Sequence, residues 1–281
     1  MPLYRPSELR TFIDSIDAKA RKSLSQNFLI DGNILDKIVD AAAVKEGDLV
    51  VEIGPGPGAL TEALLRQGAE VIAIEMDRLF APALSRLPGK LRVFQADILD
   101  FPLQELLAKE GRKAKVVANL PYHISTPILQ MLMPMHEELI SLTLLVQKEF
   151  GARLVAAANT EDYSSLSLFA QYYTHPRHCF DVKASCFTPK PRVDSSVIQL
   201  LLKETEGDPV SFFAITRRAF QQRRKMLRSS LKELYSVDAI ESALTQMGLS
   251  PQVRPEELSL AAFKQLASSL GSRGAQPAPR A

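Results

Sequence analysis

Short apolar segments alternate with longer segments of helical periodicity through the first two thirds of the sequence, and this alternation restricts the fold more than any other feature. Helical periodicity is clearest at residues 59–67 and 127–139. The apolar segments are rich in β-branched residues and lie at residues 49–53, 70–74, 91–95, 115–118 and 142–146. Strands that alternate with helices in this way predict βαβ units, and therefore an α/β domain with a Rossmann-like, mostly parallel sheet.

The pattern changes in the last third of the chain. Two apolar segments, 179–184 and 195–202, have no helical segment between them, so we expect a hairpin that places one antiparallel strand at the sheet edge. A polar linker follows at residues 204–209. Beyond the linker there is only helical periodicity, at residues 210–234, 237–247 and 255–270.

These patterns predict two domains. An α/β domain should occupy residues 1–204, and a small all-α domain should occupy residues 205–281. Residues 271–281 contain Gly, Ala and Pro without periodicity, and we expect them to form a disordered tail. With 281 residues, of which 46% are hydrophobic, the chain can bury a substantial core.

Composition excludes several classes of protein. The two cysteines and four histidines show neither a disulfide framework nor the spacing of metal ligands, so we expect a reducing compartment and no bound metal. No apolar run reaches the roughly 18 residues of a membrane span, and the charged N-terminus lacks the apolar stretch of a signal peptide. We therefore expect a cytoplasmic protein without a membrane partner. The net charge of +2 identifies no partner by itself.

Four consecutive strand segments end in a glycine or a polar side chain. A Gly-Pro-Gly-Pro-Gly loop begins at Gly54, and the next three segments end, after intervals of 21, 22 and 22 residues, in Glu75, Asp97 and Asn119. Open α/β sheets bind ligands at the carboxyl ends of their strands. An acidic residue after the second strand can accept both hydroxyls of a ribose, and Asp97 can accept from the amino group of an adenine. Each residue alone could be a helix cap, but four in register favour one ligand crevice.

Two cofactors suit such a crevice, a nicotinamide dinucleotide and S-adenosylmethionine. A dinucleotide-binding loop usually reads Gly-x-Gly-x-x-Gly, whereas the loop here is Gly-x-Gly-x-Gly and contains Pro55 and Pro57. The prolines lack the amide donors that a pyrophosphate needs. S-adenosylmethionine has no phosphate, so the sequence favours the methyl donor. A dinucleotide-dependent oxidoreductase and a non-catalytic RNA-binding assembly factor are the alternative functions.

The fourth strand segment runs into the sequence Asn-Leu-Pro-Tyr at residues 119–122. An exocyclic amino group of a base is a poor nucleophile because its lone pair is delocalised into the ring. Hydrogen bonds from that group to the side-chain oxygen of Asn119, and to the carbonyl of Leu120 or Pro121, would localise the lone pair for attack on a methyl group. Tyr122 would stack on a base that has swung out of its helix. The alternative is a proline-closed turn in which Tyr122 only covers the core.

Several motifs, in the same order along the chain, resemble the ribosomal RNA adenine dimethyltransferases, and most closely their bacterial KsgA/RsmA branch. The motifs are Ser-Gln-Asn-Phe-Leu at 25–29, Glu-Ile-Gly-Pro-Gly at 52–56, Asn-Leu-Pro-Tyr at 119–122, Gln-Lys-Glu at 147–149, Phe-Thr-Pro-Lys-Pro-Arg-Val-Asp-Ser at 187–195 and Phe-Gln-Gln-Arg-Arg-Lys at 220–225. The resemblance implies N6 dimethylation of two adjacent adenosines in a hairpin loop near the 3′ end of small-subunit (16S) ribosomal RNA. The antibiotic-resistance branch, which modifies large-subunit RNA, fits residues 221–225 and 255–259 less well.

The resemblance also assigns residues to a site. The catalytic positions it implies are Asn119, Leu120, Pro121, Tyr122 and Phe187. It implies that S-adenosylmethionine is bound by Asn27, Leu29, Gly54, Glu75, Asp97 and Asn119. Residues 22–25 and 163–167 depart from the family pattern, and we expect both segments in or near loops that face RNA.

A dense basic cluster lies in segment 210–234, which we predict as one helix. Seven basic residues and no acidic residue fall between Thr216 and Lys232, so no i, i+4 ion pair neutralises them within the helix. A solvated face is the usual explanation, but RNA phosphates would also neutralise such a cluster. We expect RNA contacts from Arg217, Arg223, Arg224, Lys225 and Arg228. The expected partner is an immature small ribosomal subunit, bound by a monomer.

Overall fold

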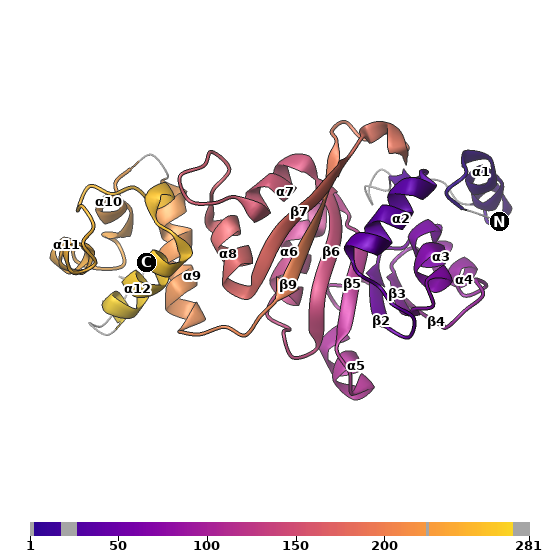
Figure 1. The fold of residues 1–281 in the computed structure, drawn as a ribbon, viewed down its shortest axis with the longest axis horizontal. Helices are drawn as coiled ribbons and strands as arrows, with labels where there is room; N and C mark the ends of the chain where they lie inside the picture. The colour runs from indigo at the N-terminus through magenta and orange to yellow at the C-terminus, as the bar shows by residue number, and fades with distance from the viewer. Residues whose placement is uncertain (1–2, 18–26, 223–224, 272–281) are drawn as a thin grey trace. The chain divides into compact units, whose positions relative to one another are not determined.

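The computed structural model of the protein describes residues 3–17, 27–222 and 225–271, and it is built around a seven-stranded sheet (Figure 1). The strand order in this sheet is β4-β3-β2-β5-β6-β9-β7. In chain order, its strands are β2 (Leu49–Ile53), β3 (Glu70–Glu75), β4 (Leu91–Gln95), β5 (Ala114–Asn119), β6 (Leu139–Gln147), β7 (Thr174–Val182) and β9 (Ser195–Leu202).

Most neighbouring strands in the sheet are parallel, which confirms the predicted fold class. The five strands from β4 to β6 in the sheet order all run parallel. Strand β9 is antiparallel to both of its neighbours, β6 and β7. The predicted hairpin at the sheet edge is therefore present: β7 takes the edge and pairs antiparallel with β9, which lies between β7 and β6.

Helices and short elements complete this part of the chain. Helices α2 and α3 pack on one face of the sheet, where their apolar side chains share a core cluster with Val50, Val71 and Val117. All five residues of β2 are buried, so the opposite face is covered as well. The elements are α1 (Pro6–Ser15), β1 (Phe28–Leu29), α2 (Gly32–Ala41), α3 (Ala59–Arg66), α4 (Phe80–Leu84), α5 (Leu103–Glu110), η2 (Tyr122–Ile124), α6 (Ser125–Leu132), α7 (Lys148–Val155), η3 (Ala184–Cys186) and β8 (Phe187–Thr188).

Helix α6 is shorter than the sequence pattern predicts. It ends at Leu132, whereas the periodicity continues to residue 139. The difference arises because Leu139 already pairs with Ala114 as the first residue of β6. None of the helices in the described part of the chain is long and apolar enough to cross a membrane.

The strand order reverses at β2, which pairs with β3 on one side and with β5 on the other. At such a point the chain connections that follow the two adjacent strands lead in opposite directions. No single crossover therefore covers the carboxyl ends of both β2 and β5. In this sheet the reversal places the ends of β2 and β5 beside each other. The glycine loop after β2 and Asn119 at the end of β5 therefore meet at the topological switch point.

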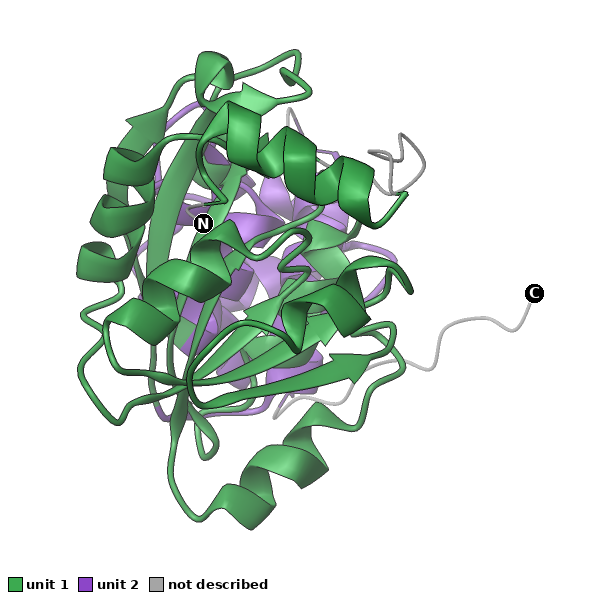
Figure 2. Ribbon diagram, turned by 90° about the vertical axis from the view of Figure 1, so that its right-hand side faces the viewer, with its two compact units in different colours: residues 1–151, 174–203 green, residues 152–173, 204–281 purple. Residues whose placement is uncertain are grey.

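The chain forms two compact units, which Figure 2 shows in green and purple. The first comprises residues 1–151 and 174–203, and the second comprises residues 152–173 and 204–281. The predicted domain boundary after residue 204 lies beside one of these junctions, but residues 152–173 do not belong to the first unit. They join the second because Tyr163, Leu168 and Tyr172 are buried in its hydrophobic core.

Among its described residues the second unit contains helices and connecting loops but no strand. Its elements are α8 (Ser165–Tyr173), α9 (Pro209–Gln221), α10 (Leu227–Leu231), α11 (Val237–Gln246), η4 (Pro255–Glu257) and α12 (Leu260–Gly271). Tyr163, which we expected near an RNA-facing loop, is instead fully buried, and its hydroxyl donates to the carbonyl of Leu258 over 2.9 Å. The departing segment 22–25 and the expected tail at 272–281 lie outside the described residues.

The prediction of one continuous helix over residues 210–234 is wrong. Helix α9 ends at Gln221, and α10 begins only at Leu227. Between them the amide of Lys225 donates to the carbonyl of Gln222 over 2.8 Å, and the amide of Leu227 donates to the carbonyl of Val253 over 2.8 Å. These turn and tertiary hydrogen bonds replace the helical ladder, so the basic residues do not share one helix face.

Candidate active site

One pocket lies at the carboxyl ends of β2, β3 and β5, and the six residues predicted to bind the cofactor all line it. They are Asn27, Leu29, Gly54, Glu75, Asp97 and Asn119. The pocket is also lined by four of the five predicted catalytic residues, Leu120, Pro121 and Tyr122 in addition to Asn119. The pocket therefore brings together residues that lie far apart in the sequence, such as Asn27 and Asn119, which are 92 residues apart.

The glycine loop takes a conformation that other residues adopt poorly. Gly54, Gly56 and Gly58 have φ angles of 63°, 56° and 101°, in the left-handed region that favours glycine. A Cβ atom on Gly56 would lie only 3.2 Å from the ring of Phe28. The loop therefore needs glycine to pass close to the pocket, and Phe28 covers it from the N-terminal segment.

Glu75 is a buried carboxylate that ties the glycine loop to β3. One of its oxygens accepts the amide of Gly56 over 2.8 Å, and the other accepts the amide of Asp77 over 2.7 Å. Burial raises the pKa of Glu75, while the hydrogen bonds from these backbone amides oppose the increase. Each carboxylate oxygen can accept a further hydrogen bond from a ligand in the pocket.

Glu52 also lines the pocket, although the sequence pattern gave it no role beyond its place in a motif. Its side chain is almost completely buried, and burial raises its pKa to about 8. Within the described residues its Oε2 atom has no hydrogen-bond partner. The signal in the sequence was a single acidic residue inside the apolar strand Leu49–Ile53, because burying a carboxyl group is costly unless it finds a hydrogen-bond partner.

The charge of the pocket is acidic. Glu52, Glu75 and Asp97 line it, and among the described lining residues there is neither a Lys nor an Arg. His123 is the one basic side chain in that lining. The carboxylates of Glu75 and Asp97 would attract cations and repel the two phosphates of a dinucleotide, whereas Glu52, with its pKa raised to about 8, is mostly uncharged at neutral pH. Elsewhere in the described residues, no cluster of His, Cys, Asp and Glu side chains is placed to hold a metal ion.

The side chains of Asn119 and Tyr122 are each held by one hydrogen bond. The Nδ2 atom of Asn119 donates to the backbone carbonyl of Asn27 over 3.0 Å. The hydroxyl of Tyr122 lies 2.9 Å from the hydroxyl of Ser195. Asn119 therefore keeps its side-chain oxygen as an acceptor, and the Tyr122 ring is fixed at its free end.

The two residues between them are held through their backbones. The amide of Leu120 donates to the carbonyl of Leu145 over 3.1 Å, which continues the pairing of β5 with β6. The carbonyl of Pro121 accepts two hydrogen bonds, from the amide of Ile124 over 3.2 Å and from the hydroxyl of Ser125 over 3.1 Å. Because a carbonyl oxygen has two lone pairs, the Pro121 carbonyl is already saturated.

Phe187 does not line the pocket, in contrast to the expectation from the sequence. Its side chain is 2% exposed and belongs to the core cluster that also contains Leu29 and Val182. Strands β8 and β1 pair so that Phe187 lies opposite Leu29. Phe187 therefore supports the N-terminal segment of the pocket from behind.

Two apolar residues of the pocket were not predicted. Leu3 and Leu9 line it, and Leu9 packs in a small cluster with Phe28 and Phe80. The sequence contained a usable signal, because apolar residues recur at helical spacing within and just after α1, at Leu9, Phe12, Ile13 and Ile16. Helix α1 therefore belongs to the wall of the pocket.

The predicted RNA-binding residues have different surroundings. Arg217 and Lys225 are exposed. Arg228 forms an ion pair with Glu241 of α11. Arg218, in the same basic segment, pairs with Glu233. Both acidic partners lie outside residues 216–232, the segment in which the sequence shows only basic charge. Arg223 and Arg224 lie outside the described residues.

Comparison with known proteins connects this site with a family. The sequence model of the ribosomal RNA adenine dimethylase family matches residues 17–271. Ribosomal RNA small subunit methyltransferase A of Protochlamydia amoebophila is 49% identical over 280 residues, which cover 97% of this chain and 99% of the relative. The protein of the same name from Chlamydia caviae is 43% identical over 273 residues, which cover 95% of this chain and 98% of the relative.

Solved structures agree with the sequence comparison. A dimethyladenosine transferase from Plasmodium falciparum superposes with a TM-score of 0.73 at 26% identity, covering 88% of this chain and 98% of that one. The 23S rRNA methyltransferase ErmE superposes with a TM-score of 0.66 at 23% identity, covering 87% of this chain and 100% of that one, and shows the shared fold. With a family match over almost its whole length, this chain belongs to the ribosomal RNA adenine dimethylase family.

Proposed function

We propose that this protein transfers methyl groups from S-adenosylmethionine to the N6 amino groups of two adjacent adenosines, in a hairpin loop near the 3′ end of small-subunit ribosomal RNA. The observation that carries this function is an acidic cofactor pocket that opens beside the Asn-Leu-Pro-Tyr sequence at the end of β5. Membership in the ribosomal RNA adenine dimethylase family, and relatives named for the small subunit, support the same activity.

The pocket residues suit S-adenosylmethionine, which supplies an electrophilic methyl group on a sulfonium centre. Glu75 would accept the ribose hydroxyls, because its two oxygens keep acceptor capacity beyond the bonds from Gly56 and Asp77. Asp97 would accept a hydrogen bond from the amino group of the adenine. Glu52 would form part of the wall beside the cofactor. Asn27 and Leu29 would cover the cofactor from the N-terminal side.

Asn119 and Leu120 would activate the amine. The sequence left the carbonyls of Leu120 and Pro121 as alternative acceptors, and the two hydrogen bonds already made by Pro121 favour Leu120. One N–H of the amine would then donate to the Oδ1 atom of Asn119 and the other to the Leu120 carbonyl. In the first transfer, with both N–H bonds held, the nitrogen lone pair is directed at the methyl carbon, and the methylated nitrogen then releases one proton to water. In the second transfer the monomethylated amine has one N–H left, which one of these acceptors would hold. Catalysis is mainly positioning, and the acidic pocket favours the amine as it becomes cationic.

Tyr122 would hold the adenine. A base reaches the pocket only after it swings out of its helix, and an aromatic ring provides a stacking surface for it at about 1–3 kcal/mol. Tyr122 lines the pocket directly after the amine acceptors, with its ring half-buried. This position suits a base whose amino group reaches Asn119.

The exposed basic residues Arg217 and Lys225 would contact RNA phosphates, together with Arg223 and Arg224. Arg228 is a weaker candidate, because its guanidinium is paired with Glu241. We further propose that the protein acts as a monomer on an immature small subunit in the cytoplasm.

The two alternative functions are less well supported. A dinucleotide would place two phosphates in a pocket whose described lining carries three carboxyl groups and neither Lys nor Arg. A role as an assembly factor that checks nascent subunits is compatible with catalysis and would use the same RNA contacts. An inactive variant that still binds subunits would reveal that second role.

Two measurements test the proposed function. Calorimetric titration should show binding of S-adenosylmethionine and no binding of NAD. Tritiated methyl groups should be transferred from S-adenosylmethionine to undermethylated small subunits and not to large subunits. Binding of NAD in place of the methyl donor, or labelling of the large subunit alone, would contradict the proposal.

A further inference from the structure

The hydroxyl of Tyr122 has a hydrogen-bond partner that plays no part in the reaction as proposed above. Its hydroxyl lies 2.9 Å from the hydroxyl of Ser195, whose side chain is fully buried. Burial raises the pKa of Tyr122, so the phenol keeps its proton and can donate at neutral pH. The other end of the side chain is attached to the short turn Tyr122–Ile124. The ring is therefore held at both ends.

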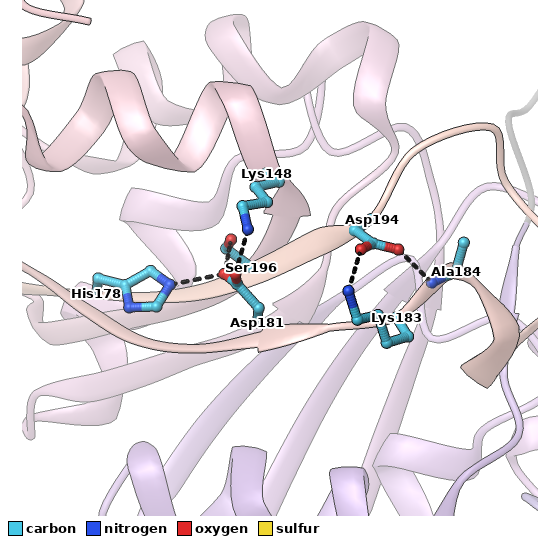
Figure 3. Close-up of polar contacts among 7 residues, drawn as sticks. All are labelled: Lys148, His178, Asp181, Lys183, Ala184, Asp194 and Ser196. Atoms are coloured by element: carbon cyan, nitrogen blue, oxygen red, sulfur yellow. Dashed lines mark hydrogen bonds and ion pairs between the residues drawn. The ribbon is translucent and has the colours of Figure 1, made fainter.

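Ser195 is a rigid partner. It is the first residue of β9 and pairs with strands on both sides, β6 and β7. The preceding residue, Asp194, is fixed as well, and Figure 3 shows its side-chain contacts. Its carboxylate accepts hydrogen bonds from the Nζ atom of Lys183 (2.9 Å) and the backbone amide of Ala184 (2.9 Å), and its backbone carbonyl accepts the amide of Lys148 (3.0 Å).

The next residue, Ser196, makes a different contact and provides a natural comparison. Its hydroxyl donates to Asp181 over 2.6 Å, and the same carboxylate accepts Lys148 over 2.5 Å and contacts His178 over 2.8 Å (Figure 3). Successive side chains in a strand point to opposite faces. The side chains of Ser195 and Ser196 therefore point to opposite faces of β9. Both serines are buried, but only Ser195 contacts Tyr122.

We propose that Ser195 is a positioning residue for methyl transfer, whose hydroxyl anchors the far end of the Tyr122 ring on which the adenine stacks. The inference rests on the proposed function, because it needs a base at Tyr122. The hydroxyl oxygen of a tyrosine lies on the axis of the second side-chain torsion, so a hydrogen bond there holds the first torsion and with it the position of the ring. Without that bond the ring keeps its apolar faces but is no longer held at its far end. The target amine is then held less well in line with the methyl group.

This role predicts a specific kinetic signature. Ser195→Ala and Tyr122→Phe each remove the same hydrogen bond and leave the ring in place. Each should lower kcat by roughly 3- to 30-fold, since small misalignments of reacting groups have large effects on rate. The KM for subunits should change by less than about 2-fold, because the stacking surface is retained. The double variant should be no slower than the slower single variant, because both changes break one bond.

The test uses the full chain, saturating S-adenosylmethionine and small subunits that lack dimethyladenosine. Ser196→Ala is the matched control: it removes one buried hydroxyl and its bond to Asp181 but should keep the wild-type kcat. A thermal melt of each variant verifies folding. If Ser195→Ala does not fold, Tyr122→Phe alone tests the bond, because it leaves Ser195 unchanged.

The outcomes separate this inference from the proposed function. Wild-type kcat in Ser195→Ala, equal losses in Ser195→Ala and Ser196→Ala, or additive losses in the double variant would each overturn the positioning role. A wild-type protein that transfers no methyl groups to small subunits would contradict the proposed function instead.

Discussion

The side-chain amide of Asn119 donates to the backbone carbonyl of Asn27 over 3.0 Å, and this bond joins the end of β5 to the N-terminal wall of the pocket. Because the nitrogen of the amide is used in this way, its oxygen is the atom that can accept a hydrogen bond from a substrate. The orientation of Asn119 is thus set by a residue that also lines the cofactor pocket. Cofactor binding and activation of the amine therefore share one structural element.

Asn119→Ala should slow methyl transfer far more than it weakens RNA binding. We expect the single-turnover rate to fall by about 10²- to 10³-fold, the usual effect of losing one transition-state hydrogen-bond partner. Affinity for subunits should change little, since the variant keeps every basic side chain that could bind a phosphate. Quenched-flow measurement of labelled product gives the rate, and the exposed Asn33→Ala serves as control. A wild-type rate in Asn119→Ala would exclude the amine-positioning mechanism.

Glu75→Ala should weaken binding of S-adenosylmethionine. The loss of a charge-assisted acceptor for the ribose hydroxyls corresponds to roughly 1.5–3 kcal/mol, or about 10- to 150-fold in affinity. The change also removes the acceptor of the Gly56 and Asp77 amides, so circular dichroism must accompany the calorimetry. The exposed Glu105→Ala should bind as the wild type does. Unchanged affinity in a folded Glu75→Ala protein would make Glu75 a purely structural residue.

Glu52→Gln should change how stability depends on pH. Burial raises the pKa of Glu52 from an ordinary 4.5 to about 8. The neutral carboxyl group of Glu52 in the folded protein contributes stability that is fully present below about pH 4.5. This contribution is lost as the pH rises through about 8, because the same group in the unfolded chain ionises at a lower pH.

Glutamine does not ionise, so the variant should gain stability relative to the wild type across that range, by a few kcal/mol at about 1.36 kcal/mol per pKa unit. Urea unfolding between pH 5 and 9 measures the difference, with the exposed Glu105→Gln as control. A difference between Glu52→Gln and the wild type that does not vary with pH would show that Glu52 is ionised in the folded protein.

Leu9→Ser should weaken cofactor binding through the wall of the pocket. Leu9 is 2% exposed, lines the pocket and packs on Phe28 and Phe80, so a polar side chain there admits water beside the cofactor. Removing a buried leucine side chain corresponds to about 1–3 kcal/mol, or roughly 5- to 150-fold in affinity. Titration with S-adenosylhomocysteine measures the affinity, and Arg10→Ala on the exposed side of α1 is the control. Equal affinities for the two variants would remove α1 from the site.

Arg217→Ala combined with Lys225→Ala should reduce affinity for small subunits and leave cofactor affinity unchanged. The slope of log K against log salt should become shallower by roughly 0.7–0.9 for each phosphate that the variant no longer neutralises. Arg218→Ala is a matched control, because Arg218 is paired with Glu233 and is not expected to bind phosphate. Should the double variant keep the wild-type slope, these two residues form a solvated surface and do not bind RNA.

The sequence was most informative where apolar strand segments recur at regular intervals along the chain. Apolar strand segments and the spacing of Gly54, Glu75, Asp97 and Asn119 predict a parallel sheet with a shared crevice, and these residues do line one pocket. Local pattern is sufficient there because parallel strands align their carboxyl ends by construction. The choice between the carbonyls of Leu120 and Pro121 could not be made from the sequence, since it depends on the bond from Ser125.

Interactions between distant residues explain what the sequence did not predict. Periodicity continues from α9 into α10, but the carbonyl of Val253 takes the amide of Leu227 and the helix is interrupted. Arg228 looked unpaired because its partner, Glu241, lies on another helix. Apolar residues recur at helical spacing in α1, but spacing alone does not show that Leu9 packs on Phe28 and Phe80 beside the pocket. Ser195 belongs to a motif, but no local pattern shows that it pairs with Tyr122, 73 residues away.

The chemical identity of the product tests the central claim most directly. Undermethylated small subunits are incubated with the protein and S-adenosylmethionine, and their RNA is digested and analysed as nucleosides by mass spectrometry. We expect N6,N6-dimethyladenosine at two residues per subunit, and none with Asn119→Ala over the same period. A methylated product that contains no dimethyladenosine would contradict the assignment of the pocket and of the Asn119–Leu120 acceptors to N6 dimethylation.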